Sequence, residues 1–307
     1  MYKVAVIGSG MTGLTAADVL SKHGCDVQVF DKGRAPGGRI STRHAPRGLF
    51  DHGAPGLVAH SGAFADLLTS LGARAGREGE YVGTPGMGTL LERYARALNL
   101  LQNVRISSLV KEEQGWVLRT DAGRAYAHFD TVISTVPAPQ AKDLIASCDQ
   151  VLAEQLENVR MHPVWTCMVE FRERLQAFEL TEPGPILRLD RMGAKPGRSD
   201  ARNAWVIHMT PAFTELNLHT DPAVIAPHIL QTFAEVSGLR LPDVLYLNAH
   251  RWRYAFADQP LGRPFLASQH AGLFVGGDWT LGREAEHAFQ SGHAIAQSAL
   301  SSIFEAV

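Results

Sequence analysis

Cysteine is scarce in this chain of 307 residues, which holds only Cys25, Cys148 and Cys167. Three is an odd number, and no two of them stand at the short spacing of zinc ligands, so a disulfide scaffold and a zinc site are both disfavoured. The 13 histidines include no HExxH-type pair. We therefore expect no metal site and a reducing, cytoplasmic environment.

The chain also lacks a long apolar run and an excess of positive charge. No stretch approaches the roughly 20 apolar residues of a membrane-spanning helix, and no basic segment precedes an apolar one at the N-terminus, as a signal peptide would require. Lys plus Arg is 29 against 31 for Asp plus Glu, giving a net charge of −2. We expect no membrane span, no signal peptide and no nucleic-acid partner.

The sequence does have ample core-forming material, with 45% hydrophobic residues, and its length is typical of two domains. KVAVI at 3–7 predicts a buried strand, 14–24 a helix, and 26–32 a second strand, which together form a βαβ unit. A long loop rich in Gly, Arg and Pro follows over 33–62. Further helices are expected at 63–71 and 89–100, and further strands at 104–106, 116–120, 125–127 and 131–134.

The pattern of predicted elements changes in the middle of the chain. Residues 136–139 (VPAP) interrupt the strands and helices, and we expect the chain to leave the first domain there. Strands at 164–171, 186–189 and 204–209, with helices at 151–159 and 222–237, indicate an antiparallel sheet. Residues 194–201 read as a polar loop. The end of the chain resembles the first domain again, with an apolar strand predicted at 273–275 and a helix over 284–304.

The first motif with chemical meaning is Gly8-Ser9-Gly10-Met11-Thr12-Gly13. It follows a strand and opens a helix, whose free N–H groups attract a pyrophosphate. Asp31 ends the second strand, where a carboxylate accepts hydrogen bonds from an adenosine ribose and repels a 2′-phosphate. The motif predicts dinucleotide binding; the alternative is a glycine-rich turn beside a surface Asp.

Three further motifs favour FAD over NAD. Gly37-Gly38-Arg39 offers a guanidinium to a phosphate or ribose, unless it is a flexible surface loop. Residues 50–54 (FDHGA) suit a backbone lying flat against a ring, unless they form an ordinary turn. Residues 276–279 (GGDW) lead into the C-terminal helix, which carries Glu286. The alternative is a C-terminal helix with a polar cap and no contact with a cofactor. An extended FAD needs this distant return of the chain, whereas a nicotinamide dehydrogenase does not.

On these residues the chain resembles the FAD-dependent amine oxidase-like flavoproteins, and most of all their bacterial renalase-like branch. The branch rests mainly on residues 250–255 (HRWRYA) and on Gly277-Asp278-Trp279, while Ser291 and Gly292 belong to the wider resemblance. The resemblance implies an α/β fold with a Rossmann-like FAD domain, which has a parallel sheet with helices, and an inserted, mainly antiparallel α+β substrate domain. It places residues 1–57, 84–139 and 248–307 in the FAD domain and 58–83 and 140–247 in the substrate domain.

The same resemblance assigns the cofactor contacts. Asp31 would hold the adenosine ribose, Arg39 the pyrophosphate, Asp278 the ribityl chain, and the backbone at Val110 the adenine. FAD would be non-covalent, because no Cys lies near the C-terminal motif. The full expected set is Gly8, Ser9, Gly10, Met11, Thr12, Gly13, Asp31, Lys32, Gly38, Arg39, Gly53, Ala54, Val110, Gly277, Asp278 and Glu286.

Renalase-like proteins oxidise the 2- and 6-dihydronicotinamide isomers of NAD(P)H to NAD(P)⁺ and pass the electrons to O₂, giving hydrogen peroxide. Amine oxidases of the superfamily place a Lys near the flavin, and the only lysines here beyond residue 32 are Lys111, Lys142 and Lys195. None lies in an evident strand facing the flavin. Two alternatives stay open: another FAD-dependent amine oxidase or desaturase, and a non-catalytic flavin-binding redox module.

Aromatic residues supply the candidate pocket, since hydride transfer from a dihydropyridine needs stacking more than an acid or base. His250, Trp252 and Tyr254 alternate along one expected strand and share a face that is either pocket or core. Trp279 either lines the pocket or packs behind the flavin, and Trp165 either lines it or belongs to the core. No general base is identified, and His162 and His208 are expected to be structural.

Overall fold

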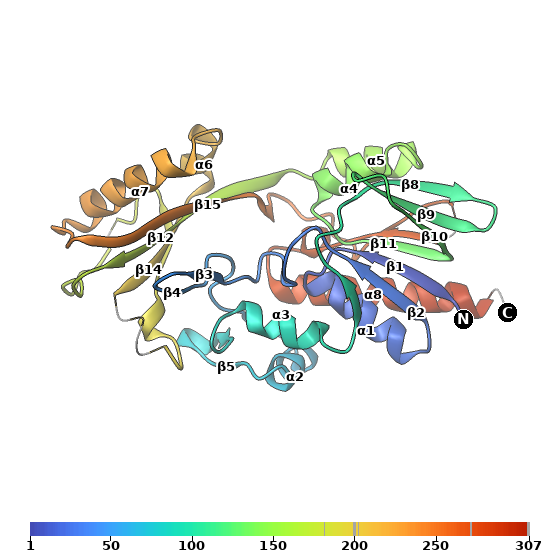
Figure 1. Cartoon of the computed structure of the whole chain (residues 1–307), viewed down its shortest axis with the longest axis horizontal. Helices are drawn as coiled ribbons and strands as arrows, with labels where there is room; N and C mark the ends of the chain where they lie inside the picture. The colour runs from blue at the N-terminus through green and yellow to red at the C-terminus, as the bar shows by residue number, and fades with distance from the viewer. Residues whose placement is uncertain (181, 199–200, 202, 271, 306–307) are drawn as a thin grey trace.

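The computed structural model describes residues 1–180, 182–198, 201, 203–270 and 272–305. The chain forms two lobes, joined by the long strands β12 (Met161–Phe171) and β15 (Val244–Ala257), with both termini at the far end of the larger lobe (Figure 1). The expected α/β class, with a parallel sheet in one part and an antiparallel sheet in the other, is confirmed.

The larger lobe is built on a six-stranded sheet in the order β16-β17-β11-β1-β2-β7, parallel except for the edge strand β16. Its strands are β1 (Lys3–Ile7), β2 (Asp26–Phe30), β7 (Asn99–Leu101), β11 (Thr131–Ser134), β16 (Leu266–Ala267) and β17 (Leu273–Val275). Successive side chains of β1 enter opposite layers: Val4 and Val6 join one core cluster, and Ala5 and Ile7 the other. Burial on both faces explains the unbroken apolar run.

Helices and a small sheet cover the two faces. The helices α1 (Met11–Lys22) and α8 (Ala285–Glu305) pack on one face. The other face carries α4 (Ala138–Ile145), α5 (Gln150–Glu157) and the sheet of β8 (Ile106–Glu112), β9 (Gly115–Thr120) and β10 (Ala125–Phe129). A third cluster joins α2 (Gly62–Ser70) and α3 (Gly88–Ala95) to α1, beside β5 (Arg74–Ala75), η1 (Arg77–Gly79) and β6 (Tyr81–Val82).

Two sequence-based expectations need correction. The helix expected over 89–100 ends at Ala95, because Leu101 pairs with Phe30 in the parallel sheet and strand pairing overrides the helical periodicity. Residues 136–139 do not leave the first lobe, because α4 begins there and packs into its core. Segment 58–83 also packs α2 into this lobe. We therefore propose that the chain passes from one lobe to the other along β12 and β15, and that the domain boundaries do not lie at residues 58–83 and 140.

The smaller lobe is a four-stranded antiparallel sheet in the order β13-β14-β12-β15, where β13 is Ile186–Arg191 and β14 is Ala204–Met209. The helices α6 (Pro211–Leu216) and α7 (Pro222–Ser237) cover one face, against Trp165, Cys167 and Val169 of β12. The other face meets the hairpin of β3 (Arg43–Ala45) and β4 (Gly48–Phe50), which lies within the expected long loop. The remaining turns are η2 (Met192–Ala194) and η3 (Asp278–Thr280). Residues 199 and 200 of the expected polar loop lie outside the described residues.

No helix in the described part of the chain has the length and apolar composition to cross a bilayer.

Candidate functional site

The glycine-rich turn lies between the end of β1 and the start of α1. Gly8 has φ +110°, a left-handed conformation that favours glycine. A Cβ on Gly13 would stand 2.0 Å from the carbonyl oxygen of Gly8, so the helix approaches the strand more closely than any other residue allows. A Cβ on Gly10 would meet no described atom within 4 Å, and no described side chain caps α1. The turn thus presents free helix N–H groups to open space, the geometry that binds a phosphate.

Asp31 lies at the end of β2, next to this turn. One of its carboxylate oxygens accepts from the N–H and from the hydroxyl of Ser9, both at 2.7 Å, and the other accepts from the Gly33 N–H at 2.6 Å. Lys32 follows, and burial and the Arg105 charge lower the pKa of its ammonium. The structure therefore places the expected ribose-binding carboxylate beside the expected pyrophosphate turn.

Arg39 connects this turn to the C-terminal motif. Its guanidinium forms an ion pair with the buried Asp278 carboxylate, with one contact at 2.9 Å, and donates to the carbonyl oxygen of Ala255 at 2.6 Å. A Cβ on Gly38 would lie 3.5 Å from the Cα of Gly10. Two groups expected to hold different parts of one cofactor are thus in direct contact, although 239 residues separate them.

Other expected cofactor residues have partners of their own. The Gly277 N–H donates to the Ser291 hydroxyl at 3.1 Å. The Glu286 carboxylate accepts from the main-chain N–H groups of His60 and Ser61, at 2.5 and 3.0 Å, and so anchors the start of α2. Val110 lies on β8, paired with Val117 of β9.

The segment 51–55 lies where the two lobes meet. The Trp252 indole N–H donates to the carbonyl oxygen of His52 at 2.8 Å, and His208 Nε2 bonds the carbonyl oxygen of Gly53 at 3.0 Å. Toward the larger lobe, the Ala54 N–H donates to the carbonyl oxygen of Arg39 at 2.8 Å. A Cβ on Gly53 would stand 2.0 Å from that same oxygen, so only glycine fits.

Three rings gather on this segment. The His52 ring stacks on Trp252 with centroids 5.2 Å apart, and His250 meets their edges at 4.9 and 4.4 Å. Burial, the neighbouring His250 and Arg43 lower the pKa of His52 to about 3, and burial, Arg43 and Arg251 lower that of His250 to about 4. Both imidazoles are therefore neutral at about pH 7.

Of the expected pocket residues, the structure brings His250 and Trp252 to this segment but not the other tryptophans. Trp279 is fully buried in the core of the larger lobe, and its indole N–H donates to the carbonyl oxygen of Val136 at 3.3 Å. Trp165 is fully buried against α6 and α7, with the Arg251 guanidinium 5.4 Å from its ring. Tyr254 follows on β15 and is half-buried.

The sheet face toward segment 51–55 carries a polar row, one residue from each strand. The register aligns Arg188 with His208, His208 with Thr166, and Thr166 with His250, and residues directly opposite one another lie on the same face. The sequence predicts a structural role for His208 and carries no signal for Thr166. Only the strand register, which a single sequence does not give, brings them together.

The lysines beyond residue 32 are each engaged. Lys111 lies 5.1 Å from the Trp116 ring, Lys142 pairs with Glu157 at 2.6 Å, and Lys195 pairs with Asp51 at 2.6 Å. Lys195 belongs to the expected polar loop, and no local pattern indicates that it reaches a buried carboxylate.

Comparisons with known proteins agree with this geometry. A family model described as an NAD(P)-binding Rossmann-like domain matches residues 6–71, and one described as a flavin containing amine oxidoreductase matches residues 61–300. A 4,4'-diapophytoene desaturase (4,4'-diaponeurosporene-forming) of Staphylococcus aureus (strain Newman) is 37% identical over 70 residues. That match spans 23% of this chain and only 14% of the desaturase.

Two solved structures share the fold over nearly the whole chain. Cyclohexylamine oxidase from Brevibacterium oxydans IH-35A superposes with a TM-score of 0.74 at 14% identity, covering 98% of this chain and 99% of that one. Putrescine oxidase bound to putrescine gives 0.73 at 14% identity, with the same coverage. At such identities the likeness shows the fold alone.

Proposed function

The chain belongs to the flavin containing amine oxidoreductase family, and from that premise we propose a renalase-type activity for this FAD-dependent oxidoreductase. It would oxidise the 2- and 6-dihydronicotinamide isomers of NAD(P)H to NAD(P)⁺. When bound, FAD supplies the hydride acceptor, and O₂ would then take up that hydride together with one proton to give hydrogen peroxide.

The polar row on the smaller sheet is the observation that supports this substrate class most directly. An apolar chain, as a desaturase would take, could form no hydrogen bonds with the neighbouring side chains of His208, Thr166 and His250. His208 Nε2 must carry its hydrogen, because the carbonyl oxygen of Gly53 can only accept. Burial lowers the pKa of His208, so its Nδ1 is a bare acceptor.

Three buried polar atoms here have no hydrogen-bond partner in the described chain: His208 Nδ1, Thr166 Oγ1 and His52 Nδ1. Leaving such groups unpaired costs about 1–3 kcal/mol each. A primary carboxamide offers two N–H donors and one carbonyl acceptor, so the amide of a nicotinamide would satisfy His208 and Thr166 together. We propose this match as the basis of substrate recognition.

Neutral rings and engaged lysines favour the same chemistry. Hydride transfer from a dihydropyridine needs a stacked, positioned ring and no base. His52, His250 and Trp252 offer uncharged surfaces, whereas each lysine beyond residue 32 has a partner of its own.

The cofactor would be held by the same groups that the sequence singled out. We propose that the start of α1 and Arg39 bind the pyrophosphate, Asp31 the ribose and Asp278 the ribityl chain. FAD would be non-covalent, since Cys25, Cys148 and Cys167 lie outside the C-terminal motif.

The test is an anaerobic titration of the purified yellow protein, followed by its visible spectrum. Addition of 2- and 6-dihydro isomers of NADH is expected to bleach the flavin within seconds, and oxygen to restore it with equal amounts of NAD⁺ and hydrogen peroxide. Putrescine, cyclohexylamine and ordinary NADH serve as controls. Bleaching by an amine but by neither isomer would replace this proposal with an amine oxidase. A flavin that none of them reduces would favour a non-catalytic redox module.

A further inference from the structure

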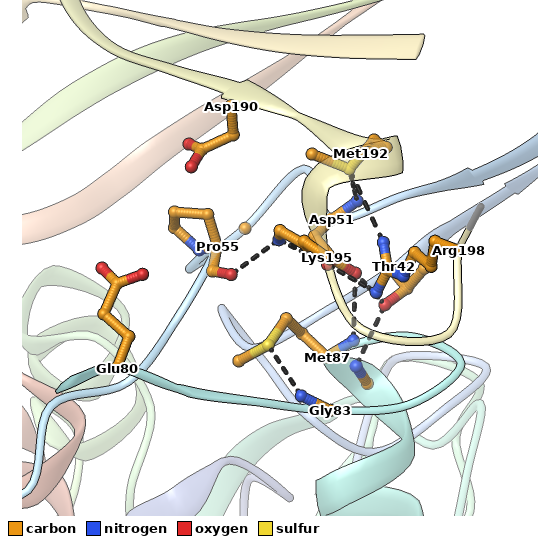
Figure 2. A network of polar contacts seen from close by, with 12 residues as sticks. Thr42, Asp51, Pro55, Glu80, Gly83, Met87, Asp190, Met192, Lys195 and Arg198 are labelled. Atoms are coloured by element: carbon orange, nitrogen blue, oxygen red, sulfur yellow. Dashed lines mark hydrogen bonds and ion pairs between the residues drawn. The ribbon is translucent and has the colours of Figure 1, made fainter. Parts of the chain in front are cut away.

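Asp51 is the centre of a buried network that joins both lobes (Figure 2). Its carboxylate is fully buried and has four partners. One oxygen accepts from the Thr42 hydroxyl at 2.7 Å and the Met87 N–H at 3.0 Å, both in the larger lobe. The other oxygen meets Lys195 Nζ at 2.6 Å and the Arg198 guanidinium at 2.7 Å, both on the loop after β13.

The charges in this network are buried as well. The side chains of Lys195 and Arg198 are only 10% and 3% exposed. Burial disfavours the Asp51 carboxylate, but Lys195 and Arg198 outweigh it and hold the pKa below its ordinary value. Asp51 is therefore ionised at neutral pH. A buried ionised pair of this kind is weak evidence for stability alone.

Lys195 has a second contact that a simple ion pair does not need. Its ammonium also donates to the carbonyl oxygen of Pro55 at 2.6 Å, and Figure 2 shows both bonds leaving the same nitrogen. Asp51 and Pro55 are the two ends of segment 51–55. Lys195 thus holds both ends of the segment at once, while Trp252 and His208 bond the carbonyl oxygens of His52 and Gly53 between them.

Any shift of this segment reaches the expected cofactor residues directly. The Ala54 N–H is bonded to the carbonyl oxygen of Arg39, and Gly53 leaves no room for movement toward that oxygen. The Arg39 guanidinium in turn pairs with Asp278. A path of direct contacts therefore runs from Lys195 through the segment to Arg39 and Asp278.

We propose that Lys195 is a positioning residue, which holds segment 51–55 against the flavin ring by bonding both of its ends from the smaller lobe. This rests on the proposed placement of FAD, but not on the proposed substrate. Lys195 would act on the cofactor through the main chain of the segment, without touching the substrate.

The test compares three variants as purified proteins, with readouts that use no substrate. Lys195→Met removes the charge and both bonds and keeps a similar length. Lys195→Arg keeps a charge and several donors. Lys142→Met removes a lysine of similar pairing at the surface, where the side chain is 38% exposed, and is the matched control. Each variant is checked for folding by circular dichroism and for FAD affinity by fluorescence, and its flavin midpoint potential is measured by dye-linked reduction.

We expect Lys195→Met to weaken FAD binding by about tenfold and to change the fine structure of the flavin bands and the midpoint potential. Lys195→Arg is expected to recover most of the affinity and the spectrum, and Lys142→Met to match the wild type. A folded Lys195→Met protein with wild-type affinity, spectrum and potential would overturn the proposal. So would a loss of FAD affinity in Lys142→Met equal to that in Lys195→Met. Because no substrate is used, failure of the renalase-type assignment leaves this test intact.

Discussion

Acid should destabilise this protein well above the pH at which its carboxylates titrate, because of buried neutral histidines such as His52 on segment 51–55 and His250 on β15. The pKa of His52 is about 3 and that of His250 about 4 in the folded protein, against 6.5 for an ordinary imidazole. As the pH falls below 6.5, these two imidazoles bind protons in the unfolded chain but stay unprotonated in the folded chain. The free energy of unfolding therefore decreases as the solution is acidified.

The size of the effect follows from these pKa values. A pKa difference of one unit corresponds to about 1.4 kcal/mol. A histidine that stays unprotonated in the folded protein therefore lowers the free energy of unfolding by about 2 kcal/mol at about pH 5. His52 is only 6% exposed and should contribute nearly all of this. His250 is less buried, and screening by water should reduce its share to about 1 kcal/mol. Together they amount to about 3 kcal/mol, a large part of the typical total of about 5–15 kcal/mol.

Urea unfolding, followed by tryptophan fluorescence at several pH values between about 7.5 and 5, measures this loss. His250→Gln removes one imidazole and should make the decline shallower by about 1 kcal/mol, although the lost ring contacts lower the stability at every pH. His44→Gln is the control, because its ring is exposed on β3. The same decline in His250→Gln as in the wild type would refute the reasoning.

Three further predictions concern the cofactor turn, the network and the polar row. Gly13→Ala places a methyl group 2.0 Å from the carbonyl oxygen of Gly8, so it should abolish measurable FAD binding in a fluorescence titration, whereas Gly62→Ala, with open space around it and no left-handed backbone, should bind normally. Asp51→Asn leaves two buried cations without a counter-charge and should lower the free energy of unfolding by about 3–5 kcal/mol, measured by urea denaturation; a loss below about 1 kcal/mol would contradict the buried pairing. Thr166→Val keeps the shape but removes the hydroxyl, so KM for the dihydronicotinamide isomers should rise about tenfold while FAD affinity is unchanged. Equal KM values would argue against the carboxamide match.

The class of cofactor could be predicted from the sequence because its signals are local. The glycine turn, Asp31 and the strand before them lie within about thirty residues, and each position has a steric or electrostatic reason that depends only on its neighbours. The strands at 3–7, 131–134, 204–209 and 273–275 were predicted at their observed bounds, since each is an apolar or β-branched run. The helix over 89–100 was predicted too long, because pairing of Leu101 with Phe30 depends on a distant strand.

The positions of the tryptophan side chains could not be predicted from the sequence. Trp279 follows directly on Asp278, and the sequence left open whether it lines the pocket or packs behind the flavin; its side chain packs into the core of the larger lobe. Alternation along β15 put His250 and Trp252 on one face, but only the fold decided that this face meets segment 51–55 and that the face with Arg251 and Trp165 meets the helices.

The sequence by itself determined the class of cofactor, since a tight turn, a helix N-terminus and a carboxylate at the end of a strand are fixed by residues close along the chain. Tertiary structure alone decided which side chains meet at segment 51–55. The row from Arg188 to His250 depends on the register of four strands, and the hold of Lys195 on Asp51 and Pro55 spans 144 and 140 residues. Contacts at such separations are set by how sheets pack and pair, and no local pattern of residue types encodes them.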